Sequence, residues 1–237
     1  MAAQGDLKLL GLSVSPFVVR VRMALHMKGL SYEYIKQDLF NKSELLLKSN
    51  PVEKKVPILI HDGKTVLDSS VIVQYIDEVW AAMGPSILPV DPYERATARF
   101  WAAYVDDKLF SAYVGVNKAV TEVERMEKVS ETLAVLEQLE EAFAKHSNGK
   151  GFFAGDSIGY LDLAVGCHLH WLKAQCKMFG VVFLDAGKTP LLATWAKRFT
   201  ETDAAKEVVP DTDVVMEYAK KRQAYRVAVA AAAASAK

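Results

Sequence analysis

Two short stretches decide the fold of this chain: residues 15–25 read SPFVVRVRMAL, and residues 56–70 read VPILIHDGKTVLDSS. In the first, Ser15 is typical of a helix N-cap and Pro16 of a first helical position, and apolar residues follow at helical spacing. In the second, two apolar runs flank the turn residues 61–64, which predicts a β-hairpin. Asp68 or Ser69 then begins another helix.

The surrounding sequence completes a pattern of alternating strands and helices. Residues 7–10, 32–35, 57–60 and 65–67 are predicted strands, and residues 44–48 are a short helix capped by Ser43. The resulting order, β-α-β-α-β-β-α, is that of a thioredoxin-like fold. We therefore expect an α/β thioredoxin-like domain over residues 1–83.

The character of the sequence changes after residue 83. Residues 84–92 are rich in proline and predict a linker. Beyond it the pattern is helical, which predicts an all-α domain over residues 93–237. The predicted helices cover residues 94–117, 121–145, 161–179, 190–200, 204–209 and 212–226, and the alanine-rich tail continues the last one.

Charge and hydropathy exclude several classes of partner. The 237 residues include 29 basic and 29 acidic side chains, so the chain has no electrostatic reason to bind nucleic acid or an anionic membrane surface. No apolar run is long enough to span a bilayer. The N-terminus lacks the basic start and apolar core of a signal peptide. We expect a cytosolic protein.

Cysteine and histidine usage predicts neither a disulfide nor a metal site. Cys167 and Cys176 lie nine residues apart, roughly 13 Å along a single helix, whereas a disulfide needs Cα atoms within about 7 Å. The five histidines show no metal-binding spacing, because His168 and His170 should face different sides of a helix.

Several side chains could together bind a small peptide that contains a thiol. At a helix N-terminus, the Ser15 hydroxyl can donate to an anionic sulfur and lower its pKa, although it could equally serve only as a cap. The bond between Val56 and Pro57 is expected to be cis, which leaves the Val56 backbone free to pair with an extended peptide.

The ends of such a peptide would be held by charged and hydroxyl groups. The Ser69 hydroxyl and N–H can hold a carboxylate, and Asp68 can accept from an ammonium group. Lys42 and Lys55 can pair with a second carboxylate, or they are simply solvated surface charges. A peptide with an α-ammonium, two carboxylates and a thiol matches glutathione.

The chain resembles plant tau-class glutathione transferases over nearly its whole length, in residues 15–25, 42–52, 54–61, 74–78 and 93–106. The resemblance implies a homodimer with glutathione as co-substrate and no metal. It implies that Ser15 is the catalytic hydroxyl, which makes the enzyme serine-type. It assigns the glutathione-binding roles as follows: Lys42 and Lys55 to the glycyl end, Val56 and Pro57 to the cysteinyl backbone, and Asp68 and Ser69 to the γ-glutamyl end.

The chain departs from the class at three positions. Asp68 stands where glutamate is usual, Glu53 where histidine is usual, and Gly159 where serine or threonine begins a capping box with Asp162. We interpret Asp162 as a folding element. The segments 106–107 (Asp106 and Asp107) and 20–22 (Arg20 to Arg22) are candidates for a dimer contact or for pairing between subunits. Asp106 of a neighbouring subunit could also hold the α-ammonium group.

The second substrate should meet the sulfur at an apolar wall, although each wall candidate could instead be a core residue. The candidates are Phe17, Phe110, Tyr113, Trp171 and Tyr218.

The expected activity is conjugation of the glutathione thiolate to hydrophobic electrophiles, as in detoxification of xenobiotics during stress, with a peroxidase side activity. A thiol-disulfide oxidoreductase would need cysteine at position 15. A non-catalytic carrier of hydrophobic ligands is the alternative.

Overall fold

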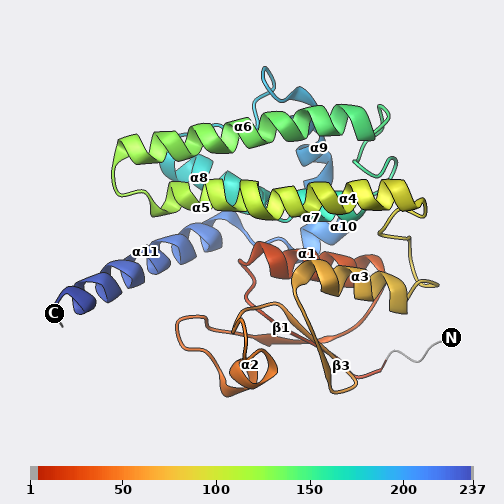
Figure 1. The fold of residues 1–237 in the computed structure, drawn as a ribbon, viewed down its shortest axis with the longest axis horizontal. Coiled ribbons are helices and arrows are strands. Elements are labelled where there is room, and N and C mark those ends of the chain that lie inside the picture. Colours follow the sequence, from red (N-terminus) through yellow and green to blue (C-terminus); the bar gives the residue numbers. More distant parts are fainter. Residues whose placement is uncertain (1–4, 236–237) are drawn as a thin grey trace.

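The computed structural model describes residues 5–235 and shows an α/β layer beside a larger helical layer (Figure 1). Residues 1–4 and 236–237, which bear on the targeting predictions, lie outside the described residues. The sheet has the order β2-β1-β3-β4, in which β1 is parallel to β2 and antiparallel to β3, and β3 and β4 form a hairpin. The strands are β1 (Leu7–Gly11), β2 (Glu33–Lys36), β3 (Ile58–His61) and β4 (Lys64–Leu67). This arrangement confirms the predicted thioredoxin-like order.

Helices cover both faces of the sheet. α1 (Pro16–Met27) and α3 (Ser69–Val79) lie between the sheet and the helical layer, and α2 (Glu44–Ser49) lies on the other side (Figure 1). The two central strands, β1 and β3, are accordingly mostly apolar, with Lys8 as the charged residue of β1. Their paired residues Leu9 and Leu59 are fully buried, as are Leu10 and Ile58.

The predicted linker, residues 84–92, is fixed to the α/β layer. The Asp77 carboxylate in α3 accepts from the backbone N–H groups of Ile87 and Leu88, both at 2.9 Å, and pairs with the buried Lys28 ammonium at 2.8 Å. Gly84 has φ +61°, and a Cβ there would lie 2.3 Å from the Met27 carbonyl oxygen. The close approach of this backbone therefore requires glycine.

The remainder of the described chain is helical and begins at Pro92, at the end of the predicted linker. Its elements are α4 (Pro92–Tyr104), the π-helical turn η1 (Val105–Leu109), α5 (Phe110–Lys118), α6 (Glu122–His146), α7 (Tyr160–Gly166), α8 (Leu169–Phe179), α9 (Pro190–Thr200), α10 (Asp203–Val208) and α11 (Thr212–Ser235). The outer end of α11 projects from the body of the molecule (Figure 1). Within residues 5–235, every helix is too short or too polar to cross a membrane.

One predicted helix is wrong, because residues 161–179 form two helices. The chain turns at Cys167 and His168, where the His168 N–H bonds to the Val165 carbonyl three residues back, at 3.1 Å. Cys167 ends α7 and Cys176 lies in α8, so the single-helix spacing does not apply to them. Both are free thiols.

The Gly159–Asp162 box forms as predicted and holds a buried turn together. Asp162 Oδ2 accepts from the Gly159 N–H at 3.0 Å, and Oδ1 accepts from the Phe153 N–H at 2.9 Å and from Trp195 Nε1 at 2.8 Å. Burial raises the pKa of Asp162 to about 6. All of these donors belong to the protein, which fits a structural role.

Candidate active site

Ser15 stands at the N-cap position of α1, but its hydroxyl makes no capping hydrogen bond. The residue has extended backbone angles, φ −75° and ψ 123°, and Pro16 occupies the first turn. Its backbone N–H donates to the Leu12 carbonyl at 2.9 Å. The position is therefore the predicted one, whereas the interpretation as a side-chain cap is wrong. The hydroxyl is left to face the adjoining cavity.

The helical layer fixes the backbone next to Ser15. The Val14 carbonyl accepts from Trp171 Nε1 at 2.7 Å and from His170 Nε2 at 3.1 Å, both at the start of α8. Burial lowers the pKa of His170 to about 4, so the ring is neutral at neutral pH. Because a carbonyl only accepts, Nε2 carries the hydrogen. The turn between α7 and α8 thus sets the position of Ser15.

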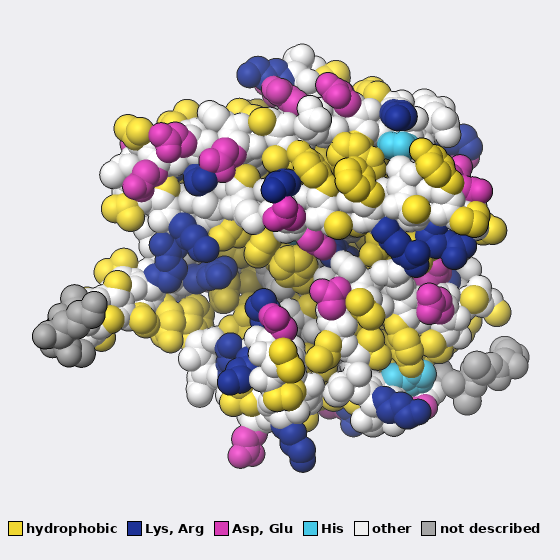
Figure 2. All heavy atoms as spheres, viewed as in Figure 1, with side chains coloured by type: hydrophobic (Ala, Val, Ile, Leu, Met, Phe, Trp, Pro, Cys, Tyr) yellow, Lys and Arg dark blue, Asp and Glu magenta, His cyan; other side chains and the backbone are white. Residues whose placement is uncertain are grey.

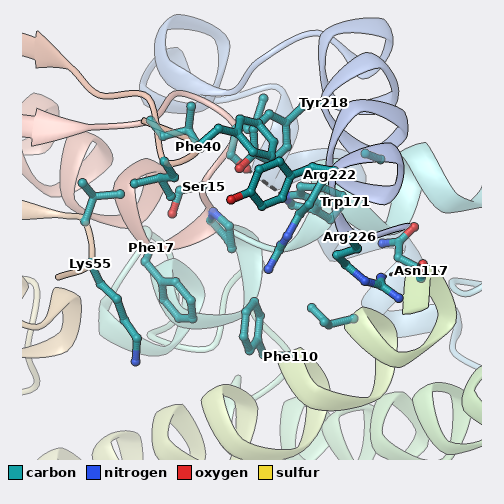
Figure 3. Close-up of a pocket in the computed structure, with 18 of the residues that line it drawn as sticks. Ser15, Phe17, Phe40, Lys55, Phe110, Asn117, Trp171, Tyr218, Arg222 and Arg226 are labelled. Atoms are coloured by element: carbon teal, nitrogen blue, oxygen red, sulfur yellow. Dashed lines mark hydrogen bonds between the residues drawn. The ribbon is translucent and has the colours of Figure 1, made fainter. Parts of the chain in front are cut away.

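A cavity of about 600 Å³ lies between the α/β layer and the helical layer (Figure 3). It brings together most of the residues predicted for the two substrates. These are Ser15, Lys42, Lys55 and Val56 for glutathione, and Phe17, Phe110, Tyr113, Trp171 and Tyr218 for the apolar wall.

The five predicted aromatic residues line the cavity as interacting neighbours. Phe17 and Phe110 are 4.9 Å apart between ring centroids, Phe110 and Tyr113 are 5.7 Å apart, and Trp171 and Tyr218 are 6.4 Å apart. The Tyr113 hydroxyl forms a hydrogen bond with His168 Nδ1 at 2.9 Å. Tyr113 is only 1% exposed, so it is a core residue behind the aromatic wall, and its polar atom is held by the protein.

The sequence prediction missed part of this lining. Phe40, in the loop after β2, packs 5.7 Å from Tyr218 and 5.0 Å from Tyr225. Arg222 and Arg226 also line the cavity. The α11 residues lie four, seven and eight positions after Tyr218, so helical periodicity alone would have placed them on its face. No comparable signal marked Phe40.

Two of the predicted glutathione ligands at the cavity, Lys42 and Lys55, carry positive charge. Lys42 is exposed, and Lys55 pairs with Glu53 on the surface. The departure from the class at Glu53 thus gives Lys55 an anionic neighbour. Exposed pairs of this kind contribute about 0–1 kcal/mol, so a ligand carboxylate can compete for Lys55.

The other predicted ligands, Pro57, Asp68 and Ser69, lie outside the lining of this cavity. The peptide bond between Val56 and Pro57 is cis, as predicted. Asp68 has φ +70°. Its Oδ1 accepts hydrogen bonds from the backbone N–H groups of Ser70, at 2.9 Å, and Val71, at 3.1 Å. Asp68 is therefore the N-cap of α3.

Arg20 links the two layers within one chain. Its buried guanidinium donates to Asp106 in η1 from Nη1 at 2.9 Å and from Nη2 at 2.5 Å, and to Ser69 Oγ at 3.1 Å. Since Ser69 accepts this bond, its O–H remains able to donate. Arg20 and Asp106 therefore pair with each other inside one chain, and Asp106 also accepts from the Ser70 hydroxyl of α3 at 3.3 Å.

This pairing sets the ionisation of Asp106. Burial opposes the charge of the carboxylate, but hydrogen bonds and charges from Arg20 and His168 outweigh burial and hold the pKa of Asp106 well below its ordinary value of 3.8. Asp106 is therefore ionised at neutral pH and committed to Arg20.

Comparisons with known proteins agree with this architecture. Residues 9–82 match the glutathione S-transferase N-terminal domain, and residues 121–198 match the glutathione S-transferase C-terminal domain. The chain is 52% identical over 223 residues to the probable glutathione S-transferase GSTU6 of Oryza sativa subsp. japonica, with 92% of this chain and 94% of the relative covered. It is 49% identical over 219 residues to glutathione S-transferase U17 of Arabidopsis thaliana, with 92% and 96% covered.

Solved structures of glutathione transferases also share this fold. The tau-class glutathione S-transferase MiGSTU from mango, Mangifera indica, superimposes with a TM-score of 0.87 at 49% identity, over 92% of this chain and 99% of that one. The rice glutathione transferase OsGSTU1, solved in complex with glutathione, gives 0.85 at 34% identity, over 94% and 99%. The chain belongs to the glutathione S-transferase family, within its plant tau class.

The buried pair predicts a pH-dependent effect of Asp106→Asn. Because the pKa of Asp106 is lowered in the folded state, its ionised form stabilises the fold above about pH 4, and this contribution is lost as pH falls further. Removing one partner of a buried pair should lower the free energy of unfolding by about 3 kcal/mol at pH 7. Urea denaturation of variant and parent at a series of pH values measures it.

The difference between Asp106→Asn and the parent should shrink below pH 4. The neighbouring Asp107, which is exposed and pairs with Lys108, provides the control, and Asp107→Asn should change stability little at any pH. An Asp106→Asn effect that stayed constant with pH would mean that the carboxylate charge is not what stabilises the fold.

Proposed function

We propose that this protein is a serine-type glutathione transferase that joins the glutathione thiolate to an electrophilic carbon of a compound in the cavity. One observation carries the proposal: the Ser15 hydroxyl at the start of α1 makes no capping hydrogen bond and faces a cavity with aromatic walls. The glutathione-bound rice structure of the same fold supports it. Residues 1–83 would bind glutathione, residues 84–92 would link the domains, and residues 93–237 would supply the wall.

Ser15 would stabilise the thiolate form of glutathione. Its hydroxyl makes no capping hydrogen bond and lines the cavity, so its O–H can donate to a sulfur placed there. At the start of α1, Pro16 has no N–H, and the N–H groups of Val18 and Val19 donate to the Ser15 carbonyl. The Phe17 N–H and the helix dipole are left to favour negative charge at the same place. A sulfur held there has a lowered pKa, as cysteine thiolates have at helix N-termini. More of the bound thiol is then ready to attack at neutral pH.

The rest of glutathione would extend from Ser15 along the α/β layer. The backbone of Val56, beside Pro57, would pair with the cysteinyl residue. Lys42 and Lys55 would bind the glycyl carboxylate. Asp68 and Ser69, at the start of α3, would bind the ammonium and carboxylate of the γ-glutamyl end, for which the Ser69 O–H is free to donate.

The reaction then needs the electrophile to lie against the sulfur. The thiolate forms a carbon–sulfur bond, the leaving group departs with its electron pair, and the thiol proton passes to solvent. The aromatic wall would hold the electrophile and exclude water, so that the protein contributes proximity. The same thiolate can attack an organic peroxide, which would give a peroxidase side activity.

Ser15→Ala tests the catalytic assignment. We expect kcat for an aryl halide to fall by roughly 10²-fold, since an anion-stabilising donor is lost. Stability should change little, because this hydroxyl makes no capping bond. The absorbance of bound glutathione thiolate near neutral pH should also disappear in the variant.

Ser15→Thr is the matched variant, because it keeps a hydroxyl and should keep part of the activity. Full turnover by Ser15→Ala would remove Ser15 from the mechanism. If the parent protein binds apolar compounds without any turnover, the carrier alternative replaces the enzyme.

Asp68→Asn tests the placement of the γ-glutamyl end. Asparagine can still cap α3, so the substitution removes the charge and keeps the fold. This interaction is far from the sulfur and should act equally in ground and transition states. KM for glutathione should therefore rise by roughly tenfold with little change in kcat. Asp68→Glu keeps the charge and should leave KM unchanged or lower. A large fall in kcat at constant KM would mean that Asp68 acts on the thiol instead.

We also propose a cytosolic homodimer. The two free thiols fit a reducing compartment. Large apolar side chains are exposed on α3 and α4, among them Val71 at 50%, Phe100 at 64% and Tyr93 at 79%, and a monomer would leave them in water. Light scattering at micromolar concentration should give about twice the chain mass of 26.2 kDa. A single-chain mass would contradict the dimer.

A further inference from the structure

The cavity carries an excess of positive charge that the whole chain does not have. The sequence is neutral overall, yet all charged side chains among the described lining residues are cationic. They are Lys42, Lys54, Lys55, Lys118, Arg222 and Arg226. Figure 2 shows lysine and arginine side chains gathered on both sides of a hollow with a hydrophobic floor. The cavity is thus apolar inside and positive around its opening.

Glutathione would use only the part of this charge that lies on the α/β layer. Lys42 and Lys55 are assigned to its glycyl carboxylate, and Lys55 already has Glu53 beside it. Arg222 and Arg226 come from α11, and Lys118 from the end of α5, in the helical layer. These cations remain for the second substrate.

Arg222 is the cation best placed to meet that substrate. Its side chain reaches from α11 into the cavity that Ser15 and Phe110 also line (Figure 3). Burial raises the pKa of Tyr218, and the charge of Arg222 acts against this effect, so the guanidinium lies within electrostatic reach of the aromatic wall. Within residues 5–235, no carboxylate forms a salt bridge with Arg222.

The neighbouring arginine is held differently. Arg226 donates from Nη2 to the Lys118 carbonyl at 3.2 Å and from Nη1 to the Asn117 carbonyl at 3.5 Å. It therefore attaches α11 to the end of α5. This contact helps to hold the helix that carries Arg222 across the cavity.

We propose that the second substrate is an aromatic electrophile that carries a carboxylate or sulfonate, and that Arg222 pairs with this anionic group. The inference rests on the proposed function and specifies its substrate class. The rings of Phe110 and Tyr218 contact the apolar body, and the guanidinium binds two oxygens of the anion in its planar fork. The cationic opening also offsets the repulsion between this anion and bound glutathione, which carries two carboxylates and the thiolate.

The test compares two aryl chlorides, a chlorodinitrobenzoate and its methyl ester; the ester lacks the negative charge and is intrinsically the more reactive, so the readout is the change between parent and variant. In both, the thiolate forms a bond to the ring carbon and chloride leaves with its electron pair. The ratio of kcat/KM for carboxylate over ester cancels effects common to both compounds. We expect Arg222→Gln to lower this ratio by roughly tenfold, equivalent to about 1.4 kcal/mol.

Lys220→Gln is the matched control, because Lys220 is an exposed α11 cation outside the cavity lining. It removes the same charge from the same helix and should leave the ratio unchanged. Arg222→Lys keeps the charge and should restore part of the ratio. The carboxylate-over-ester ratio of the parent protein should also fall with added salt, since Arg222 is exposed.

A binding measurement keeps the inference testable without turnover. Anilinonaphthalene sulfonate and phenylnaphthylamine share an apolar body, and only the first is anionic. Fluorescence titration should show a roughly tenfold higher Kd for the sulfonate in Arg222→Gln, relative to the neutral dye. Lys220→Gln should show no such change.

The two proposals fail in different ways. If the parent conjugates the ester but Arg222→Gln leaves both the kcat/KM ratio and the relative Kd unchanged, the anionic substrate class is wrong and the transferase stands. If the parent conjugates neither compound, the proposed function is wrong. The dye titration then decides alone whether Arg222 binds anions.

Discussion

The buried guanidinium of Arg20 is the constraint on which the arrangement of the two layers depends. A buried charge is costly unless it is paired and hydrogen-bonded. Arg20, on α1, meets this need with Asp106 in η1 and with Ser69 on α3. Any shift of the helical layer away from the α/β layer would leave the charge without its partner. The pair therefore fixes the position of α1, the helix that begins beside Ser15.

A second contact between the layers acts directly at the site. The Val14 carbonyl accepts from His170 and Trp171, which reach it because the chain turns between α7 and α8. The backbone before Ser15 is thus held from the side that receives the electrophile. Under the proposed function, this contact would hold Ser15 and the aromatic wall in a fixed relation, which favours a constant distance between the sulfur and the electrophile.

The helix α11 lies at one end of the cavity, between the α/β layer and the rest of the helical layer (Figure 1). Tyr218 and Tyr225 pack against Phe40, while Arg226 bonds to the end of α5, so α11 contacts both layers. The same helix supplies Arg222. Under the proposed function, activation of the thiol would depend on the α/β layer, and α11 would add Tyr218 and Arg222 to the electrophile site that Phe110 and Trp171 also line.

The sequence by itself determined the local elements and the chemistry that depends on them. Ser15, Pro16 and the hairpin at residues 58–67 follow from short-range turn and capping rules, and helical periodicity could have revealed the face of α11. The tertiary structure determined which side chains from distant parts of the sequence come into contact. Only packing shows that Arg20 pairs with Asp106 inside one chain, since the two residues are 86 positions apart. Only packing brings His170 and Trp171 to the Val14 carbonyl and Phe40 to the cavity, because long-range contacts leave no periodic trace in a sequence.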